Sequence, residues 1–217
     1  MEWPLLADLP PDEVREVLQV ARRRRFSRGE VVFHRDDPGD SLHLIVKGRF
    51  AIRVMTPRGE TATIAVRAPG ESFGEMALVS GTERRSASVA ALEEAETFAI
   101  YRDEFERLRA RHVGVDRVLI RFLANELRVQ NERLLEALYV PVERRVLRRL
   151  VELVRIYPAE DGEPLIPLTQ EVLAELAGTS RATVNRVLND EERRGTVSLE
   201  RGKTRVLDPA ALAQRAR

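Results

Sequence analysis

The sequence predicts an α+β protein in which a strand-rich N-terminal domain, one long helix and a mostly helical C-terminal domain follow one another. Between residues 26 and 101, short segments rich in Val, Ile, Phe and Leu are separated by glycines roughly every ten residues, which is typical of short antiparallel strands. Between residues 113 and 139, apolar residues recur at alternating steps of three and four, which indicates a helix. Two further helix-length segments then flank Gly178. We therefore divide the chain into residues 1–112, 113–139 and 140–217.

Composition excludes several classes of protein. The chain has 217 residues, of which 43% are hydrophobic and 33% charged, and its net charge is +1. Any nucleic-acid-binding surface must therefore be a local basic patch. The absence of cysteine excludes disulfides, thiolate zinc sites and cysteine-ligated iron–sulfur clusters. We see no signal-peptide pattern and no apolar run near the ~20 residues that span a bilayer, so we expect a cytoplasmic protein without a membrane partner.

The first segment, residues 4–25, predicts a short amphipathic helix. Pro11 suits its first turn, and Val14 and Val17 recur at helical spacing. The basic run Arg22–Arg25 follows. It could be a nucleic-acid or membrane patch, but we interpret it as the solvated end of this helix.

The glycine-separated segments predict a barrel or a jelly-roll-like sandwich. The strand candidates are Val31–Phe33, Leu42–Val46, Phe50–Val54 and Ala62–Val66, with a hairpin turn at Pro57–Gly59. The histidines at 34, 43 and 112 are not at metal-ligand spacing, so we expect no metal site.

A motif lies at residues 73–89, which read FGEMALVSGTERRSASV and end in a strand-like segment. Gly74 lets a ligand approach the backbone, and the apolar turn after it can present free N–H groups to a phosphate. Glu75 can accept a hydrogen bond from a ribose hydroxyl, while Arg85 can donate two bonds to phosphate oxygens. These parts together suit a cyclic nucleotide, although a bare surface turn with solvated arginines is the simpler alternative. The candidate ligand-binding residues are Gly74, Glu75, Met76, Arg85 and Ser86.

The segment from Arg102 to about Leu138 returns to helical spacing. We expect Asp103 to cap a short helix, and a longer helix to begin near Val115. Its apolar stripe consists of Ile120, Leu123, Leu127, Gln130, Leu134 and Ala137. Such a stripe predicts the seam of a symmetric dimer, the alternative being packing against the chain's own β domain. Gln130 would need a partner if buried, and a purine could supply one, so Gln130 and Asn131 are candidate base contacts.

The second motif lies at residues 168–188. Thr169 and Ser180 are expected N-caps of two short helices, and Gly178 makes the turn between them. This is a helix-turn-helix, whose second helix enters the DNA major groove, although a solvated helical hairpin would share the pattern. The candidate DNA contacts in this motif are Thr169, Gln170, Ser180, Arg181, Thr183 and Arg186.

The segments around this motif complete the C-terminal domain. Tyr139–Val142 contains a proline and predicts a hinge, followed by a helix from Glu143 to about Tyr157 and a polar loop over residues 158–167. Residues 197–207 predict a two-stranded wing whose basic tip, including Lys203, contacts DNA phosphates. Asp208 is expected to cap a last helix.

With both motifs in this order, essentially the whole chain resembles the cyclic-AMP receptor protein and fumarate–nitrate regulator (Crp/Fnr) superfamily of bacterial transcription factors. The resemblance implies a β-roll that binds a cyclic nucleotide, cyclic AMP first, with an acidic turn at residues 36–40. It further implies a homodimer on two-fold-symmetric double-stranded DNA, with RNA polymerase as a further partner, and no catalytic cofactor. Two positions depart from the family pattern. Gln130 and Asn131 stand where cyclic-AMP receptors have Thr-Ser, and Ala182 replaces a glutamate that helps to read cytosine.

Two alternatives stay open at this point. The same fold could act without a nucleotide or with another effector, or the nucleotide domain could regulate a protein partner. An enzyme is not expected, because the sequence offers no nucleophile–base–orienter set and no Walker loop.

Overall fold

The chain forms two compact units, residues 1–129 and 130–217, in a computed structural model that describes residues 3–7, 9–56, 59–79, 84–159 and 162–217. The division falls inside the long helix α4 (Val113–Tyr139), which the sequence-derived boundaries at 112 and 139 bracket. The predicted turn residues Pro57 and Arg58, and residues 80–83 of the first motif, lie outside the described residues.

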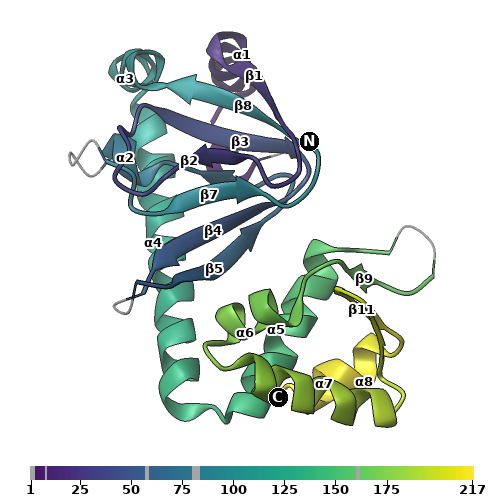
Figure 1. Ribbon diagram of the computed structural model, residues 1–217. Coiled ribbons are helices and arrows are strands. Elements are labelled where there is room, and N and C mark those ends of the chain that lie inside the picture. Colours follow the sequence, from purple (N-terminus) through teal and green to yellow (C-terminus); the bar gives the residue numbers. More distant parts are fainter. Residues whose placement is uncertain (1–2, 8, 57–58, 80–83, 160–161) are drawn as a thin grey trace. The chain divides into compact units, whose positions relative to one another are not determined.

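The N-terminal unit is built on two antiparallel four-stranded sheets, with strand orders β1-β8-β3-β6 and β2-β7-β4-β5. Figure 1 shows the strands stacked one below another, with the first part of α4 running past one end of them. The strands are β1 (Arg22–Phe26), β2 (Val31–Phe33), β3 (Ser41–Lys47), β4 (Phe50–Met55), β5 (Thr61–Arg67), β6 (Ser72–Phe73), β7 (Ser88–Ala91) and β8 (Ala95–Tyr101). The four strand candidates lie within β2 to β5, which confirms the predicted sandwich.

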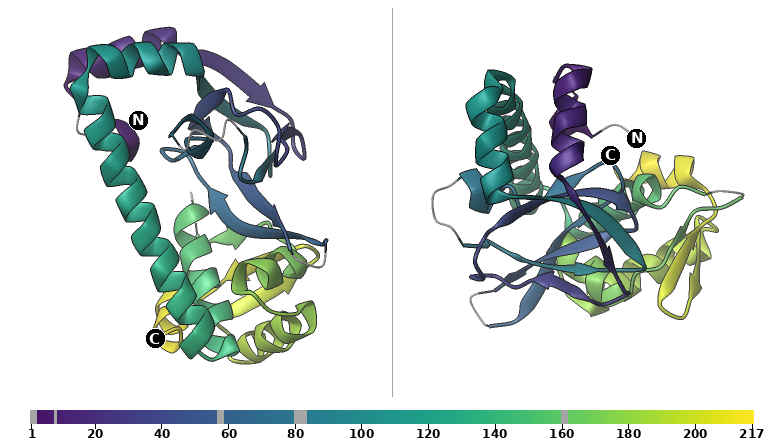
Figure 2. Two further views of the ribbon diagram at one scale, coloured as in Figure 1. Left: turned by 90° about the vertical axis from the view of Figure 1, so that its left-hand side faces the viewer. Right: turned by 90° about the horizontal axis from the view of Figure 1, so that it is seen from above.

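Two hydrophobic clusters hold this unit together. One lies between the sheets and joins Phe26, Ile45, Phe50 and Phe73, with the rings of Phe50 and Phe73 4.9 Å apart. The other packs the 3₁₀ turn Pro4–Leu6, α1 (Pro11–Val20), α3 (Arg102–Arg111) and the first turns of α4 onto β3 and β8. These helices lie along the sheet that contains β8, as Figure 2 shows from two further sides.

Two predictions in this unit are wrong. The run Arg22–Arg25 is not the end of a helix but strand β1, which pairs with β8 from Arg22–Ala99 to Phe26–Ala95. The four arginines are all exposed, so the alternation that identifies a strand is absent from the sequence, and Glu96 on β8 pairs with Arg23 and Arg25. Asp103 does not cap α3. It lies in the first turn, where its charge suits the helix dipole, and Tyr101 occupies the N-cap without a side-chain hydrogen bond.

The C-terminal unit contains α5 (Val142–Ile156), α6 (Gln170–Ala177), α7 (Arg181–Arg193) and α8 (Pro209–Arg215). Beside them lies a sheet of order β10-β11-β9, formed by Val197–Glu200, Lys203–Val206 and Leu165–Ile166. The wing therefore has a third strand, β9. The sequence analysis did not predict it, because its two residues lie in a segment interpreted as a polar loop. Asp208 caps α8 as predicted, its carboxylate accepting hydrogen bonds from the Ala210 and Ala211 amides.

Replacing Gly48 by alanine should destabilise the N-terminal unit strongly. Gly48 has φ +77°, and an added Cβ would lie 2.6 Å from the Ala95 Cβ and 2.7 Å from the Glu94 carbonyl oxygen. The left-handed backbone costs about 1–2 kcal/mol for alanine, and the overlap should add about 1–3 kcal/mol. Urea unfolding followed by Trp3 fluorescence measures the total loss in the free energy of unfolding, because this single tryptophan is buried in the unit's core.

Gly29→Ala is the matched control for this substitution. Its φ is +82°, but no described atom lies within 4 Å of an added Cβ, so it should show the conformational cost alone. Equal losses for the two variants would contradict the steric argument at Gly48.

Candidate functional site

The first motif forms a pocket between β6, the short helix α2 (Met76–Val79) and the start of β7. All five predicted ligand residues of this motif, Gly74, Glu75, Met76, Arg85 and Ser86, line it. Gly74 has φ +91°, and a Cβ there would lie 2.8 Å from both the Arg85 Nη1 and the Ser41 carbonyl oxygen. Only glycine therefore allows the arginine to lie so close to this turn.

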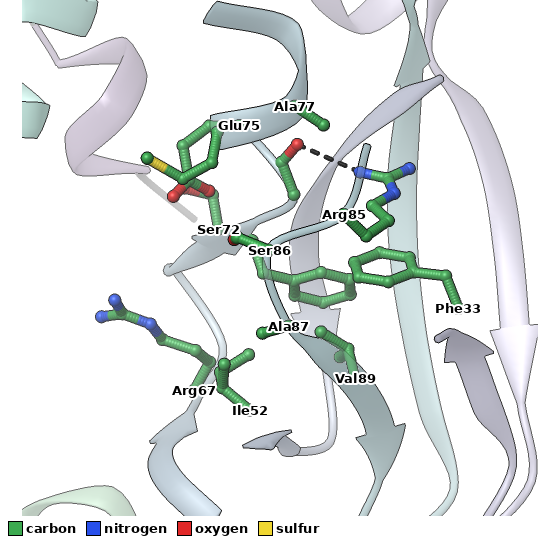
Figure 3. A pocket seen from close by; sticks show the side chains of 13 residues that line it. Phe33, Ile52, Arg67, Ser72, Glu75, Ala77, Arg85, Ser86, Ala87 and Val89 are labelled. Carbon is green, nitrogen blue, oxygen red and sulfur yellow. Dashed lines mark hydrogen bonds between the residues drawn. The ribbon is translucent and has the colours of Figure 1, made fainter. Parts of the chain in front are cut away.

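Arg85 is the central cation of the pocket and is 3% exposed. Its Nη1 donates to the carbonyl oxygens of Ser41 (2.7 Å) and Gly74 (3.1 Å), the second of which is the dashed line in Figure 3. Its Nη2 donates to the Ser41 Oγ (2.9 Å) and the Asp40 Oδ1 (3.1 Å), and the guanidinium lies 3.9 Å from the centre of the Phe33 ring. Its buried Nε has no hydrogen-bond partner among the described residues. The neighbouring Arg84 is exposed and donates to the Asp36 carbonyl instead, so it lies outside the pocket.

A buried polar network lies behind Arg85. The Ser41 hydroxyl is 3.2 Å from the His43 Nε2, and the His43 Nδ1 is 3.0 Å from the Thr97 Oγ1. The His43 ring stacks on Phe73 at 4.9 Å. Burial, and after it the charge of Arg85, lowers the pKa of His43 to about 3. The ring is therefore neutral near pH 7 and adds no second positive charge beside Arg85.

Glu75 supplies the acidic side of the pocket. Its Oε2 is buried and has no hydrogen-bond partner in the described part of the chain. Burial raises the pKa of Glu75, while its own backbone N–H and the charge of Arg67 oppose this rise. A donor on a ligand would relieve the unpaired oxygen.

The sequence analysis did not name the rest of the pocket wall as ligand contacts, although part of it belongs to the motif at residues 73–89. The additional lining residues are Phe33, Ile52, Arg67, Ser72, Phe73, Ala77, Ala87 and Val89. Most are strand residues whose apolar character predicted only a core. Arg67 ends β5 and belongs to no motif, so only the fold reveals its place at the pocket (Figure 3).

Gln130 and Asn131 do not line this pocket. Both are exposed on α4, at the first two positions of the second unit. Their contact with a base stays a prediction.

The second motif has the predicted local geometry. The Thr169 Oγ1 accepts from the Val172 amide (3.3 Å), and the Ser180 Oγ accepts from the Thr183 amide (3.2 Å), so both are N-caps. Gly178 ends α6 in the left-handed region, with φ 60° and ψ 50°. Two caps and one glycine thus set the turn between α6 and α7.

The predicted DNA contacts lie at or near the surface of this unit. Thr169, Ser180, Arg181, Arg186 and Lys203 are exposed, whereas Gln170 and Thr183 are half-buried. The Arg186 Nη2 donates to the Glu143 Oε1 of α5 at 2.7 Å.

The structure adds two amides that the sequence analysis overlooked. The Asn189 Nδ2 donates to the Asn185 Oδ1 (2.9 Å), and the Asn185 Nδ2 donates to the Gln170 Oε1 (3.1 Å). Asn185 and Asn189 follow Arg181 at successive four-residue steps along the helix, which was the available signal.

The described residues contain no group of three or more His, Cys, Asp or Glu side chains that could hold a metal ion. Among these residues, no helix combines the length and apolar character needed to cross a bilayer.

Two family models match the chain in order. The cyclic nucleotide-binding domain matches residues 23–112, and the Crp-like helix-turn-helix domain matches residues 144–215. These matches cover the pocket and the second motif respectively.

Relatives match over nearly the whole length. The cyclic AMP receptor protein of Thermus thermophilus is 35% identical over 211 residues, which cover 97% of this chain and 95% of the relative. The CRP-like cAMP-activated global transcriptional regulator of Mycobacterium tuberculosis is 33% identical over 195 residues, covering 88% and 87%. The crystal structure of the Thermus thermophilus catabolite activator protein covers 98% of both chains at 35% identity, with a TM-score of 0.57. These relatives are transcription regulators and not enzymes. The chain therefore belongs to the Crp/Fnr superfamily and is a DNA-binding transcription regulator with a cyclic nucleotide-binding domain.

Proposed function

We propose that the protein is a homodimeric regulator whose DNA affinity is controlled by a cyclic nucleotide, with cyclic AMP the first choice. The observation that carries this proposal is a pair of buried polar atoms of opposite character in one pocket. The Arg85 Nε is a donor and the Glu75 Oε2 an acceptor, and neither has a partner among the described residues. Most buried polar atoms have a hydrogen-bond partner, and a ligand in this pocket could supply one to each of these two atoms.

The pocket's chemistry fits a cyclic nucleotide. Arg85 and Ser86 offer donors for a phosphodiester, and Glu75 offers an acceptor for a ribose hydroxyl. Ile52, Ala87 and Val89 give the apolar wall that small-ligand sites use for rings. Because the four Nη hydrogens of Arg85 already have protein acceptors, the ligand would engage the free Nε–H or replace one of these bonds.

The exposed face of α4 supports a homodimer. Ile120, Leu127 and Leu134 follow one another at seven-residue steps and are 67%, 63% and 58% exposed. A heptad repeat of exposed apolar residues is what a two-helix seam requires. On the family resemblance, Gln130 and Asn131 stay the proposed base contacts.

We propose that the two α7 helices of the dimer read a two-fold-symmetric site from the major groove. Arg181 and Arg186 suit guanine, and the capping residues Thr169 and Ser180 together with Thr183, Gln170 and Lys203 suit the phosphate backbone. Ala182 has no polar atom in its side chain, so the half-site differs from one read through a glutamate there. RNA polymerase is a further proposed partner, on the family resemblance alone.

Titration of the purified full chain with cyclic AMP tests whether cyclic AMP is the effector. Duplexes selected from random-sequence DNA in the presence of cyclic AMP supply the probe. We expect a heat of binding and at least about a fivefold rise in DNA affinity, a usual size for allosteric coupling. No heat and no change in DNA affinity would reject the effector and leave the regulator acting without a nucleotide or with another ligand.

Substituting Arg85 by alanine should reduce cyclic AMP affinity at least about a hundredfold, because the phosphodiester loses its charged donor. Calorimetry measures the loss, and Trp3 fluorescence shows whether the domain remains folded. The matched control is Arg84→Ala, which removes an equal charge outside the pocket and should leave the affinity within about threefold. Similar losses for both variants would contradict the role of Arg85.

Substituting Arg186 by alanine should weaken binding to the selected duplex by about 1–3 kcal/mol if its guanidinium contacts a guanine. Fluorescence anisotropy with the selected and a scrambled duplex separates base reading from phosphate binding. Arg193→Ala is the control, because Arg193 lies at the far end of the same helix and pairs with Asp190. Equal losses on both duplexes would show that Arg186 contacts phosphate only.

A further inference from the structure

Arg67 lies at the wall of the pocket and is held by two carboxylates. Its Nη1 donates to the Glu71 Oε1 at 3.0 Å, and its Nη2 donates to the Glu126 Oε2. The side chains of Arg67 and Glu126 are only 21% and 22% exposed. An ion pair this far removed from water is screened little, and loss of one partner leaves the other charge buried and unpaired.

The second carboxylate belongs to helix α4. Earlier in this helix, Val115, Val118 and Leu119 are buried in the cluster that covers β3 and β8, and Phe122 packs against it. Glu126 follows Phe122 by four residues and so lies on the same side of the helix, one turn further on. The Arg67–Glu126 pair therefore joins the pocket wall directly to α4 within the N-terminal unit.

Arg67 also acts on Glu75. Burial raises the pKa of the Glu75 carboxyl, and Arg67 opposes this rise, while Glu126 adds to it and Arg85 opposes it more weakly. The charge of Arg67 thus interacts both with Glu75, the acceptor in the pocket, and with Glu126, a carboxylate of helix α4. A ligand hydroxyl that donates a hydrogen bond to Glu75 would change the attraction between Glu75 and Arg67, and with it the attraction between Arg67 and Glu126.

We propose that Arg67 is a positioning residue that connects occupancy of the nucleotide pocket to helix α4, through Glu75 on one side and Glu126 on the other. The proposal rests on the proposed control by a cyclic nucleotide. The charge of Arg67 favours the ionised form of Glu75, which can accept a hydrogen bond from a ligand hydroxyl, and Glu126 connects Arg67 to the helix. An effector acts only through interactions that differ between two states, and the Arg67–Glu126 pair is the interaction to which we assign that difference.

The test compares Arg67→Met, Arg67→Lys and Glu126→Gln with wild type in the full chain. For each, cyclic AMP affinity is measured from pH 5 to pH 8, and DNA affinity is measured with and without cyclic AMP on the selected duplex. We expect Glu126→Gln to keep cyclic AMP affinity at pH 7.5 within about threefold and to reduce the coupling factor at least about fivefold.

Arg67→Met should also change the pH profile of cyclic AMP binding. Without the cation, Glu75 takes up its proton at higher pH, so affinity on acidification falls at a higher pH than in wild type. Arg67→Lys keeps the charge and should restore the wild-type profile. A merely structural role of Arg67 would lower stability without moving this profile.

Glu93→Gln is the matched control, because the Arg49–Glu93 pair (2.7 Å) is also partly buried in this unit but does not line the pocket. This substitution should change neither the pH profile of cyclic AMP affinity nor the effect of cyclic AMP on DNA affinity. If wild type responds to cyclic AMP and the Arg67 and Glu126 variants respond as wild type does, only this inference is overturned. If wild type itself neither binds cyclic AMP nor changes its DNA affinity, the proposed function fails and this inference with it.

Discussion

The pocket of the N-terminal unit depends on one buried cation. The Arg85 guanidinium needs acceptors in place of water, and it finds them in two backbone carbonyls, a hydroxyl and the Asp40 carboxylate. These acceptors come from the start of β3 and from the turn after β6, so the arginine fixes the two segments against each other. Gly74 is required for the same reason, because any side chain there would displace the guanidinium. The pocket and the packing of its walls thus arise from one interaction.

This cation also determines the chemistry around it. The Ser41 hydroxyl lies between Arg85 and His43, and a protonated imidazole there would place two buried positive charges about one side chain apart. Burial and Arg85 together hold the pKa of His43 at about 3, so the ring stays neutral and acts as a hydrogen-bonding and stacking group. Glu75 shows the opposite case. Its buried carboxyl has cations nearby, so the charge that a ligand hydroxyl would meet depends on residues outside the motif.

The sequence predicted those parts of the site whose geometry is local. Gly74, Glu75 and Arg85 lie within twelve residues, and each has a chemical role that its type and position determine. The same holds for Thr169 and Ser180, since an N-cap is decided within one turn. Arg67 could not be found in this way, because its partner Glu126 is 59 residues away and belongs to another element. The prediction for strand β1 failed for a different reason. With arginines at four successive positions, nothing in the sequence distinguishes the face toward the core from the face toward water.

Helix α4 combines a pattern visible in the sequence, the heptad stripe, with a contact visible only in the structure, the Arg67–Glu126 ion pair. Its first turns are buried against the β domain through Val115, Val118 and Leu119, and Glu126 then adds a charged contact to the pocket wall. Beyond that contact Leu127, Leu134 and Leu138 of the helix are exposed, so only a surface outside this chain's described contacts could bury them. Glu126 and the exposed residues after it belong to one helix, in which each peptide N–H bonds to the carbonyl four residues earlier. The heptad stripe alone indicated a seam, and the ion pair alone would be a structural contact. Because both lie on one helix, we propose that a ligand that alters the charge balance at Arg67 would also act on the surface through which two protomers associate.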